Sequence, residues 1–422
     1  MVFHNGPSAD AAPRRSQAVA VVVALSVALF ALSTVETLPV GLLPTIARDL
    51  DVSPSAVGRL VTGYGLVVAV MSVPLTYLAR RLPRRALLIA LLSLFVAATA
   101  VSAAAPNYGI LFASRIAGPL THAVYWSIVA ATAAGLFPPH VRGRVVAGLF
   151  SGLSLASVVG VPAGTWLGQQ MTWRAPFFAM SGLGFVALAT IIALLPGRAV
   201  EESHASRGAE PNARRFAVLM ATIGVAVTGI FTVFTYITVF LTEVAGFSEA
   251  AAAPVLLAAG VAGFLGTSTA GMLVDRHPQL SMLVAVGLQA ATLTSMVAIG
   301  HVPAAAVILV MILTFSISAM ITSLQSRILL VAPGSTEIAS AAGSAIFNVG
   351  IAGGSLLGSV LLATDSGVRG ILLIGAVLAT AALLILLSEP LWVARSRAGD
   401  SAGDSASAAA EPTALRDSAL IR

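Results

Sequence analysis

The sequence predicts an all-α membrane protein with twelve transmembrane helices, arranged as two pseudo-symmetric bundles of six. Three observations lead to this fold class. Of the 422 residues, 58% are hydrophobic and only 9% are charged, whereas a soluble domain carries about 25% charged residues. Apolar windows long enough to cross a bilayer recur along the chain, and the two halves repeat the same motifs. Unbroken apolar runs also argue against a β-barrel, which shows short alternating segments.

Composition excludes several classes of function. Cysteine is absent, so the chain has no disulfides, no cysteine metal site and no thiol chemistry. All 23 basic residues are arginine, and without lysine there is no Walker A motif and no Schiff base. The net charge of +6 does not indicate a nucleic-acid partner, because the arginines cluster beside apolar runs as topology signals do.

Windows of about 20 apolar residues mark the twelve expected spans. They lie near 18–42, 57–78, 86–105, 109–136, 146–168, 173–195, 216–242, 251–273, 280–299, 303–330, 337–363 and 368–388.

The polar stretch 196–215 divides the spans into six and six, which defines the domain organisation. We expect five segments: a disordered tail over 1–17, a first bundle over 18–195, a linker over 196–215, a second bundle over 216–390 and a disordered tail over 391–422. Most arginines fall in segments on the side of the two termini. The positive-inside rule therefore places both termini in the cytoplasm. Four arginines fall on the other side: Arg48, Arg59, Arg174 and Arg369.

An internal repeat supports the two-bundle prediction. The loop after the second span has Arg81 and Pro83 where the loop after the eighth has Arg276 and Pro278. Glycines also recur at one register, because Gly160 and Gly164 in the fifth span correspond to Gly350 and Gly354 in the eleventh. A glycine in every fourth position permits close helix packing. Packing alone does not predict the same register in both halves, so the shared register indicates an internal repeat.

These loops resemble the conserved loop of the major facilitator superfamily, roughly G-x-L-x-D-R-x-G-R-[RK]. The second copy keeps Gly271, Leu273, Asp275 and Arg276. The first copy departs from the pattern at Thr76, Arg80 and Pro83 but retains Arg84 and Arg85. Ser114-Arg115 with Gly118 resembles the arginine motif of the fourth span. Gly160-Val-Pro162-Ala-Gly164 is similar to the Gly-Pro motif of proton-driven exporters. The resemblance implies the major facilitator fold.

Within that superfamily the chain most resembles bacterial sugar efflux transporters of the drug–proton antiporter branch. The stretches that carry this are 40–44, 122–128, 160–164 and 346–351. The resemblance implies a monomeric, proton-coupled exporter of sugars or sugar-like metabolites in the bacterial cytoplasmic membrane. The partners that it implies are a small-molecule substrate, protons and the lipid bilayer, and we expect no cofactor. The alternative is an antiporter of drugs or secondary metabolites.

Three ionisable residues lie inside expected spans, where each is a functional hypothesis by default: Glu36, Arg115 and His122. Glu36 and Arg115 both lie about 10 Å below the outer ends of their spans, at about 1.5 Å per residue. The resemblance implies that both spans line the central cavity, and that a carboxylate at the place of Glu36 is the protonation site. Alternatively, Glu36 and Arg115 form a static pair, or Arg115 binds backbone carbonyls. His122 follows Arg115 by two helical turns and faces the same way, as a proton relay or as a hydrogen-bonding partner.

Polar and aromatic side chains in the spans are candidates for substrate contact, because sugars are held by aromatic faces and amides. They are Tyr64, Tyr125, Trp126, Phe234, Tyr236, Gln325 and Asn348. Most aromatics in membrane helices pack or lie at interfaces, so we expect about half of them to touch substrate.

The remaining candidates concern gating and packing: Arg80, Arg81, Arg84, Arg85, Gly160, Pro162, Gly164, Asp275, Arg276, Gly350 and Gly354. The arginine loop is a topology signal or a gate contact, and Pro162 removes a backbone donor from the fifth span. No His or carboxylate cluster has metal-ligand spacing, and neither H-E-x-x-H nor G-x-S-x-G occurs. We therefore expect no metal site and no enzyme.

Overall fold

The computed structural model describes residues 15–79, 82–138, 141–195, 209–274, 276–334 and 336–390. Every regular element within these ranges is helical. The first half contains α1 (Arg15–Gly41), α2 (Leu43–Asp49), α3 (Pro54–Ala79), α4 (Arg84–Ala104), α5 (Tyr108–Gly135), α6 (Arg142–Leu155), the π-helical turn η2 (Ala156–Gly160), α7 (Val161–Gln170) and α8 (Arg174–Leu194). The second half contains α9 (Ala213–Phe234), α10 (Ile237–Glu243), the 3₁₀ turn η3 (Glu249–Ala251), α11 (Ala252–Val274), α12 (Pro278–Ile299), α13 (Pro303–Val331), α14 (Thr336–Leu362) and α15 (Gly367–Leu387).

Eleven segments of the described chain are long and apolar enough to cross a membrane, judged by length and composition. The other long helix is α5, with 28 residues. It contains Arg115 and His122, and these ionisable side chains lower its hydropathy. Helices satisfy every backbone hydrogen bond within one segment, which is why they can cross the hydrocarbon core. The predicted all-α membrane fold is confirmed.

Two of the predicted spans are interrupted, and one of these also begins earlier than expected. The expected span 216–242 is two helices, because the chain leaves the helical path at Thr235 and Tyr236 between α9 and α10. The expected span 146–168 contains a π-helical turn between α6 and α7. The seventh span begins at Ala213, inside the expected linker, where the Asn212 side chain accepts a hydrogen bond from the Arg215 amide and caps α9.

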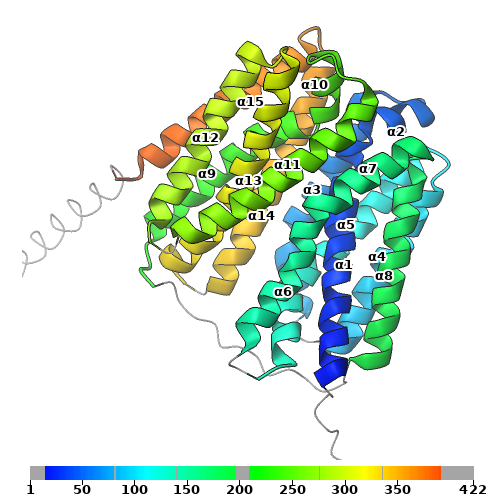
Figure 1. Cartoon of the computed structure of the whole chain (residues 1–422). Helices are drawn as coiled ribbons and strands as arrows, with labels where there is room; N and C mark the ends of the chain where they lie inside the picture. Colours follow the sequence, from blue (N-terminus) through cyan, green and yellow to red (C-terminus); the bar gives the residue numbers. More distant parts are fainter. Residues whose placement is uncertain are drawn as a thin grey trace, which may run out of the picture.

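The helices form two groups that approach each other at one end and separate toward the other (Figure 1). The two main contacts between the groups are equivalent under the internal repeat. In one, α3 packs on α14, and in the other, α11 packs on η2 and α7. These are the second, eleventh, fifth and eighth spans, so the pairing follows the internal repeat. We name the end where α1 begins the terminal face, and the opposite end the far face.

The two halves meet on the far face through hydrogen bonds and one ion pair. Ser355 and Ser359 of α14 donate to the carbonyls of Gly58 and Ser55 at 2.8 and 3.0 Å. Arg48 Nη2 of α2 lies 2.7 Å from Glu249 Oε2 of η3. Since these partners come from opposite halves, the far face is closed in this conformation.

Polar contacts also hold the far face within the first half. Asp49 at the end of α2 accepts hydrogen bonds from the Trp173 indole, at 2.8 Å, and from the Arg174 guanidinium. These hydrogen bonds lower the pKa of the Asp49 carboxyl below its ordinary value. The contact joins α2 to the start of α8.

Buried charges gather at the terminal ends of the second half. Arg327 of α13 and Glu389, which follows α15, form an ion pair of 2.6 Å, and each side chain is 3% exposed. Arg215 Nε lies 3.9 Å from the same carboxylate oxygen. The amides of Ala209 and Glu210 donate to the carbonyls of Leu329 and Leu330, which lie in the last turn of α13. The ends of α9, α13 and α15 are thereby tied together.

Candidate functional site

Glu36 lies on α1, which packs mainly within the first half and also contacts α10 and α11 of the second half. Its side chain is 25% exposed, and it lines a cavity at the boundary between the halves. Five of the eight residues that line this cavity are apolar: Val40, Val61, Phe231, Phe234 and Ile351. The others are Glu36, Thr37 and Tyr64. The carboxylate therefore lies in a largely apolar environment between the two domains.

His122 of α5 is the side chain that contacts the Glu36 carboxylate. Its Nδ1 atom lies 3.3 Å from Glu36 Oε2. The same Nδ1 lies 2.9 Å from the hydroxyl of Tyr64 on α3. The Tyr64 and His122 rings meet edge to face, with their centroids 5.8 Å apart. One imidazole nitrogen is thus shared between a carboxylate and a phenol.

The side chain of Arg115, two helical turns before His122 on α5, contacts backbone carbonyls in the same region of α1. Its Nη1 donates to the Val35 carbonyl at 2.7 Å, and its Nη2 donates to the Glu36 carbonyl at 3.0 Å. The guanidinium carbon lies 5.0 Å from the Tyr64 ring centroid, and the residue is 2% exposed. The structure thus brings Glu36, Arg115 and His122 together, with Arg115 on carbonyls rather than on the carboxylate.

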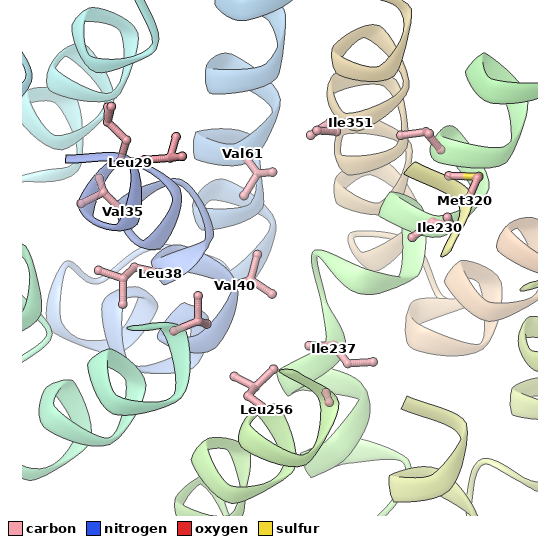
Figure 2. Close-up of a cluster of buried hydrophobic side chains, with 14 of the residues drawn as sticks. Leu29, Val35, Leu38, Val40, Val61, Ile230, Ile237, Leu256, Met320 and Ile351 are labelled. Atoms are coloured by element: carbon pink, nitrogen blue, oxygen red, sulfur yellow. The ribbon is translucent and has the colours of Figure 1, made fainter. Parts of the chain in front are cut away.

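The cavity beside Glu36 has a volume of about 60 Å³. Small-molecule sites generally measure about 300–1,000 Å³, so this space holds a few waters rather than a sugar. Figure 2 shows Val61 on α3 and Ile351 on α14 on either side of the boundary between the halves. In this conformation the space beside Glu36 is therefore smaller than a small-molecule site of that size.

A second, smaller cavity lies behind Tyr64 within the first half. Its volume is about 10 Å³, and Thr99, Ser102, Ser114 and Arg115 contribute polar groups to its wall. The Ser102 and Ser114 hydroxyls are 2.7 Å apart. Tyr64 lines both cavities, so a single side chain contributes to the wall of each.

The residues expected to touch substrate divide into two groups. Tyr64 and Phe234 line the Glu36 cavity. Tyr125 is fully buried within the first half, where its hydroxyl donates to the Leu25 carbonyl at 2.8 Å. Tyr236 is also fully buried, and its hydroxyl donates to the Ser355 carbonyl at 3.2 Å in the far-face contact. In this conformation both tyrosines pack the helices.

The expected amides lie away from the cavity wall. Asn348 is 7% exposed, and its amide nitrogen donates to the Ser344 carbonyl of its own helix at 2.9 Å. Gln325 is exposed on α13 and does not line the Glu36 cavity. The Trp126 side chain lies outside the described part of the structure.

The glycines of the fifth and eleventh spans pack against the first helix of their own half. A Cβ at Gly160 would overlap the Thr34 hydroxyl of α1, and one at Gly164 would meet Leu38. In the second half, a Cβ at Gly350 or Gly354 would meet α9 at Val227 or at the Thr228 carbonyl. The shared register in sequence therefore corresponds to a shared packing role. Pro162 is buried in the first turn of α7, directly after the π-helical turn.

The loop residues are partly described. Arg84 begins α4, and Arg85 Nη2 donates to the Ile192 carbonyl in the last turn of α8 at 2.7 Å, where a cation favours the helix C-terminus. Arg276 is exposed after α11. Arg80, Arg81 and Asp275 lie outside the described residues, so the expected gate contacts stay predictions.

The sequence analysis missed one feature of the site and one buried ion pair outside it. Pro39, three residues after Glu36, removes a backbone donor from α1 at the place where Arg115 binds. Arg327 lies inside the expected span 303–330, and it is buried with Glu389, a partner 62 residues away. The proline could have been found from its spacing, whereas the ion pair depends on tertiary packing. In the described residues, no three His, Cys, Asp or Glu side chains are grouped to hold a metal ion.

Comparison with known proteins agrees with this architecture. Residues 25–355 match the family model of the Major Facilitator Superfamily. A bacterial homologue of the human lysosomal transporter Spinster, in an inward-facing and unoccupied conformation, has a similar fold with a TM-score of 0.66. The sequences are 14% identical, and the match covers 90% of this chain and 96% of that one. The human organic anion transporter MFSD10 (TETRAN) gives a TM-score of 0.63 at 18% identity, covering 88% and 100%. The family match, which spans most of the described helices, shows that this chain is a multi-pass membrane protein that belongs to the major facilitator superfamily of transporters.

Proposed function

We propose that the protein is a proton-coupled secondary transporter that exports small molecules across the bacterial cytoplasmic membrane by alternating access, with Glu36 as the proton-carrying group. The observation that carries the proposal is the Glu36–His122 contact of 3.3 Å inside a cavity between the two halves. A carboxylate in a membrane span is costly and marks a functional site by default. It lies where opening of either face would change its exposure to water.

The shared Nδ1 atom of His122 allows two hydrogen-bond arrangements, one for each protonation state of Glu36. When Glu36 is ionised, an N–H on Nδ1 donates a hydrogen bond to the carboxylate, and the Tyr64 oxygen can only accept from that N–H. When Glu36 is protonated, Nδ1 is an acceptor and receives a hydrogen bond from the carboxyl or from the Tyr64 hydroxyl. Tyr64 can therefore reverse its role as the proton moves, since a phenol both donates and accepts.

The closed far face gives the proposal a direction. With both termini in the cytoplasm, as the arginine distribution favours, the far face is the outer face. The hydrogen bonds of Ser355 and Ser359 and the Arg48–Glu249 pair then close the outside. Opening outward requires these contacts to break, and it would expose Glu36 to the external proton supply.

Sugars are the substrate class favoured by the sequence resemblance. The cavity lining favours a second class, because Phe231 and Phe234 and three aliphatic side chains make up most of it. Such a surface suits an amphipathic or aromatic molecule, as in the drug and secondary-metabolite antiporters. An organic anion, the substrate class of the human structural neighbour, is disfavoured, because the exposed charge here is a carboxylate and Arg115 binds carbonyls.

The coupling role is tested by Glu36→Gln in proteoliposomes with an imposed pH gradient. We expect the variant to lose transport driven by the gradient but to retain exchange. Glu243→Gln is the matched control, because Glu243 is exposed at the end of α10. If Glu36→Gln still concentrates substrate against its gradient, Glu36 is not the coupling group.

The substrate class is tested in cells that lack their main exporters. Retention of sugars is compared with sensitivity to amphipathic antibiotics, and resistance without altered sugar retention excludes the sugar hypothesis.

A further inference from the structure

Pro39 lies inside α1, where a helix normally has an unbroken series of backbone hydrogen bonds. Proline has no N–H, so the carbonyl four residues earlier loses its helical donor. That carbonyl belongs to Val35, which is 7% exposed. A buried carbonyl without a donor is unfavourable, above all in a membrane where water cannot replace the bond.

Arg115 provides the missing donor. Its Nη1 lies 2.7 Å from the Val35 oxygen, which is the shorter of its two contacts with α1. The second, from Nη2 to the Glu36 carbonyl, measures 3.0 Å. The planar guanidinium spans two successive carbonyls, a geometry that its fixed fork of donors allows. Both nitrogens of the fork are therefore committed to backbone at the point where proline interrupts the helix.

This arrangement decides which group faces the Glu36 carboxylate. The titratable and charged groups around it in the described structure are His122 and Arg115 of α5 and Tyr64 of α3. The residues that face it from the second half, Phe231, Phe234 and Ile351, are apolar. Arg115 is the one permanently charged member of this set, and it bonds to the carbonyl of Glu36 rather than to the carboxylate. The carboxylate is left to the neutral-or-charged His122.

We propose that Pro39 is a positioning residue for proton coupling: by leaving the Val35 carbonyl without a helical donor, it holds the Arg115 guanidinium on the backbone and away from the Glu36 carboxylate. The inference rests on the proposed coupling role of Glu36. An arginine paired with a carboxylate favours the ionised form, and a carrier that stays ionised cannot take up and release a proton. The proline thus keeps Glu36 protonatable beside a fixed positive charge.

The test replaces Pro39 and follows the protonation of Glu36 directly. Pro39→Ala restores an N–H that can bond to the Val35 carbonyl, which frees the guanidinium to reach the carboxylate. Infrared titration of the purified full-length protein detects the absorption band of protonated carboxyl groups. The component of this band that disappears in Glu36→Gln is assigned to Glu36. We expect Pro39→Ala to lower the pH midpoint of that band by about one unit or more, since a neighbouring arginine shifts a carboxyl by about 1–3 units. The readout needs no substrate.

A matched control and a double variant separate positioning from a general effect of removing a kink. Pro74→Ala, which removes an exposed proline from α3 of the same half, should leave the midpoint unchanged. Combining Pro39→Ala with Arg115→Gln should return the midpoint toward the wild-type value, because no guanidinium is left to pair with Glu36. The loss of melting temperature caused by Arg115→Gln should also be smaller in the Pro39→Ala background, where the Val35 carbonyl has its helical donor.

The outcomes distinguish this inference from the proposed function. A Glu36 band whose midpoint is the same in wild type and Pro39→Ala overturns the role of Pro39 and leaves the coupling role of Glu36 standing. A shift that persists in the double variant also overturns it, because the freed guanidinium would not be the cause. A wild-type protein with no titrating Glu36 band overturns both.

Discussion

Arg115 and Glu36 meet through the backbone rather than through their charges: Nη2 of Arg115 donates to the carbonyl of Glu36 at 3.0 Å, while the Glu36 carboxylate lies 3.3 Å from His122. The two residues share one level of the membrane, yet their opposite charges do not form an ion pair. The arginine therefore stabilises the helix that carries the carboxylate, and the histidine is the side chain that contacts the carboxylate itself. Four further predictions follow from contacts of this kind.

Tyr64→Phe should alter coupling without unfolding the protein. The substitution removes the hydroxyl that lies 2.9 Å from His122 Nδ1 and fills the same volume. We expect the pH dependence of transport in proteoliposomes to shift, while the melting temperature stays close to wild type.

Tyr125→Phe is the matched control for the tyrosine test. Its hydroxyl bonds to the buried Leu25 carbonyl away from the cavity, so its loss leaves an unpaired acceptor and costs about 1–3 kcal/mol. We expect lower stability with an unchanged pH profile. Equal pH shifts in the two variants would show that Tyr64 has no special role.

Reversing the charge of either Arg48 or Glu249 should favour opening of the far face, and reversing both charges should restore its closed state. These side chains are 67% and 36% exposed, and an exposed pair contributes about 0.2–1 kcal/mol. Arg48→Glu or Glu249→Arg alone removes this attraction and adds a like-charge repulsion, so each should raise the open population by at least about 1.4- to 5-fold, and the double reversal should restore it.

The absence of cysteine makes this measurement direct. Spin labels at Asp51→Cys and Glu243→Cys, which are exposed positions in opposite halves, report the distance across the far face. High salt should reduce the difference between wild type and the single variants. Identical distance distributions in all four proteins would mean that the pair has no part in closing this face.

Glu389→Gln should destabilise the second half. The substitution leaves Arg327 charged and buried without its partner at 2.6 Å, and breaking a buried pair costs about 3–5 kcal/mol. Glu210→Gln is the control, because Glu210 is 67% exposed and lies 3.8 Å from Arg215. Thermal unfolding in detergent measures both, and a similar small loss for the two would contradict a stabilising role for the buried pair.

Gly354→Ala and Gly353→Ala form a pair of adjacent substitutions with opposite outcomes. A Cβ at Gly354 would overlap the Thr228 carbonyl of α9 and lie 2.8 Å from the Thr232 amide nitrogen, whereas one at Gly353 would lie no closer than 3.8 Å to Thr228. Overpacking costs about 1–3 kcal/mol, so Gly354→Ala should lower the melting temperature. Gly353→Ala should preserve or slightly raise it, since alanine favours helix. The prediction fails if both are neutral.

The sequence was sufficient for the helices and for the level of the ionisable groups. Hydropathy identifies the spans because the bilayer demands long apolar segments, and the helical rise places Glu36 and Arg115 at one depth. The sequence did not predict the rotation of each helix about its axis, which decides where a side chain points. Tyr125 and Tyr236 look like cavity residues by position, yet their rings point into helix contacts. The partners of Arg327 and Arg115 depend on how helices far apart in sequence pack, which hydropathy does not encode.

Tyr64 forms part of the wall of two cavities, of about 60 and about 10 Å³. One side chain of the first half is therefore common to both walls. A change of its side-chain rotamer would alter the shape of both spaces at once. The space beside the Glu36 carboxylate thus responds to the torsion of a single aromatic side chain, as well as to the relative position of the two halves.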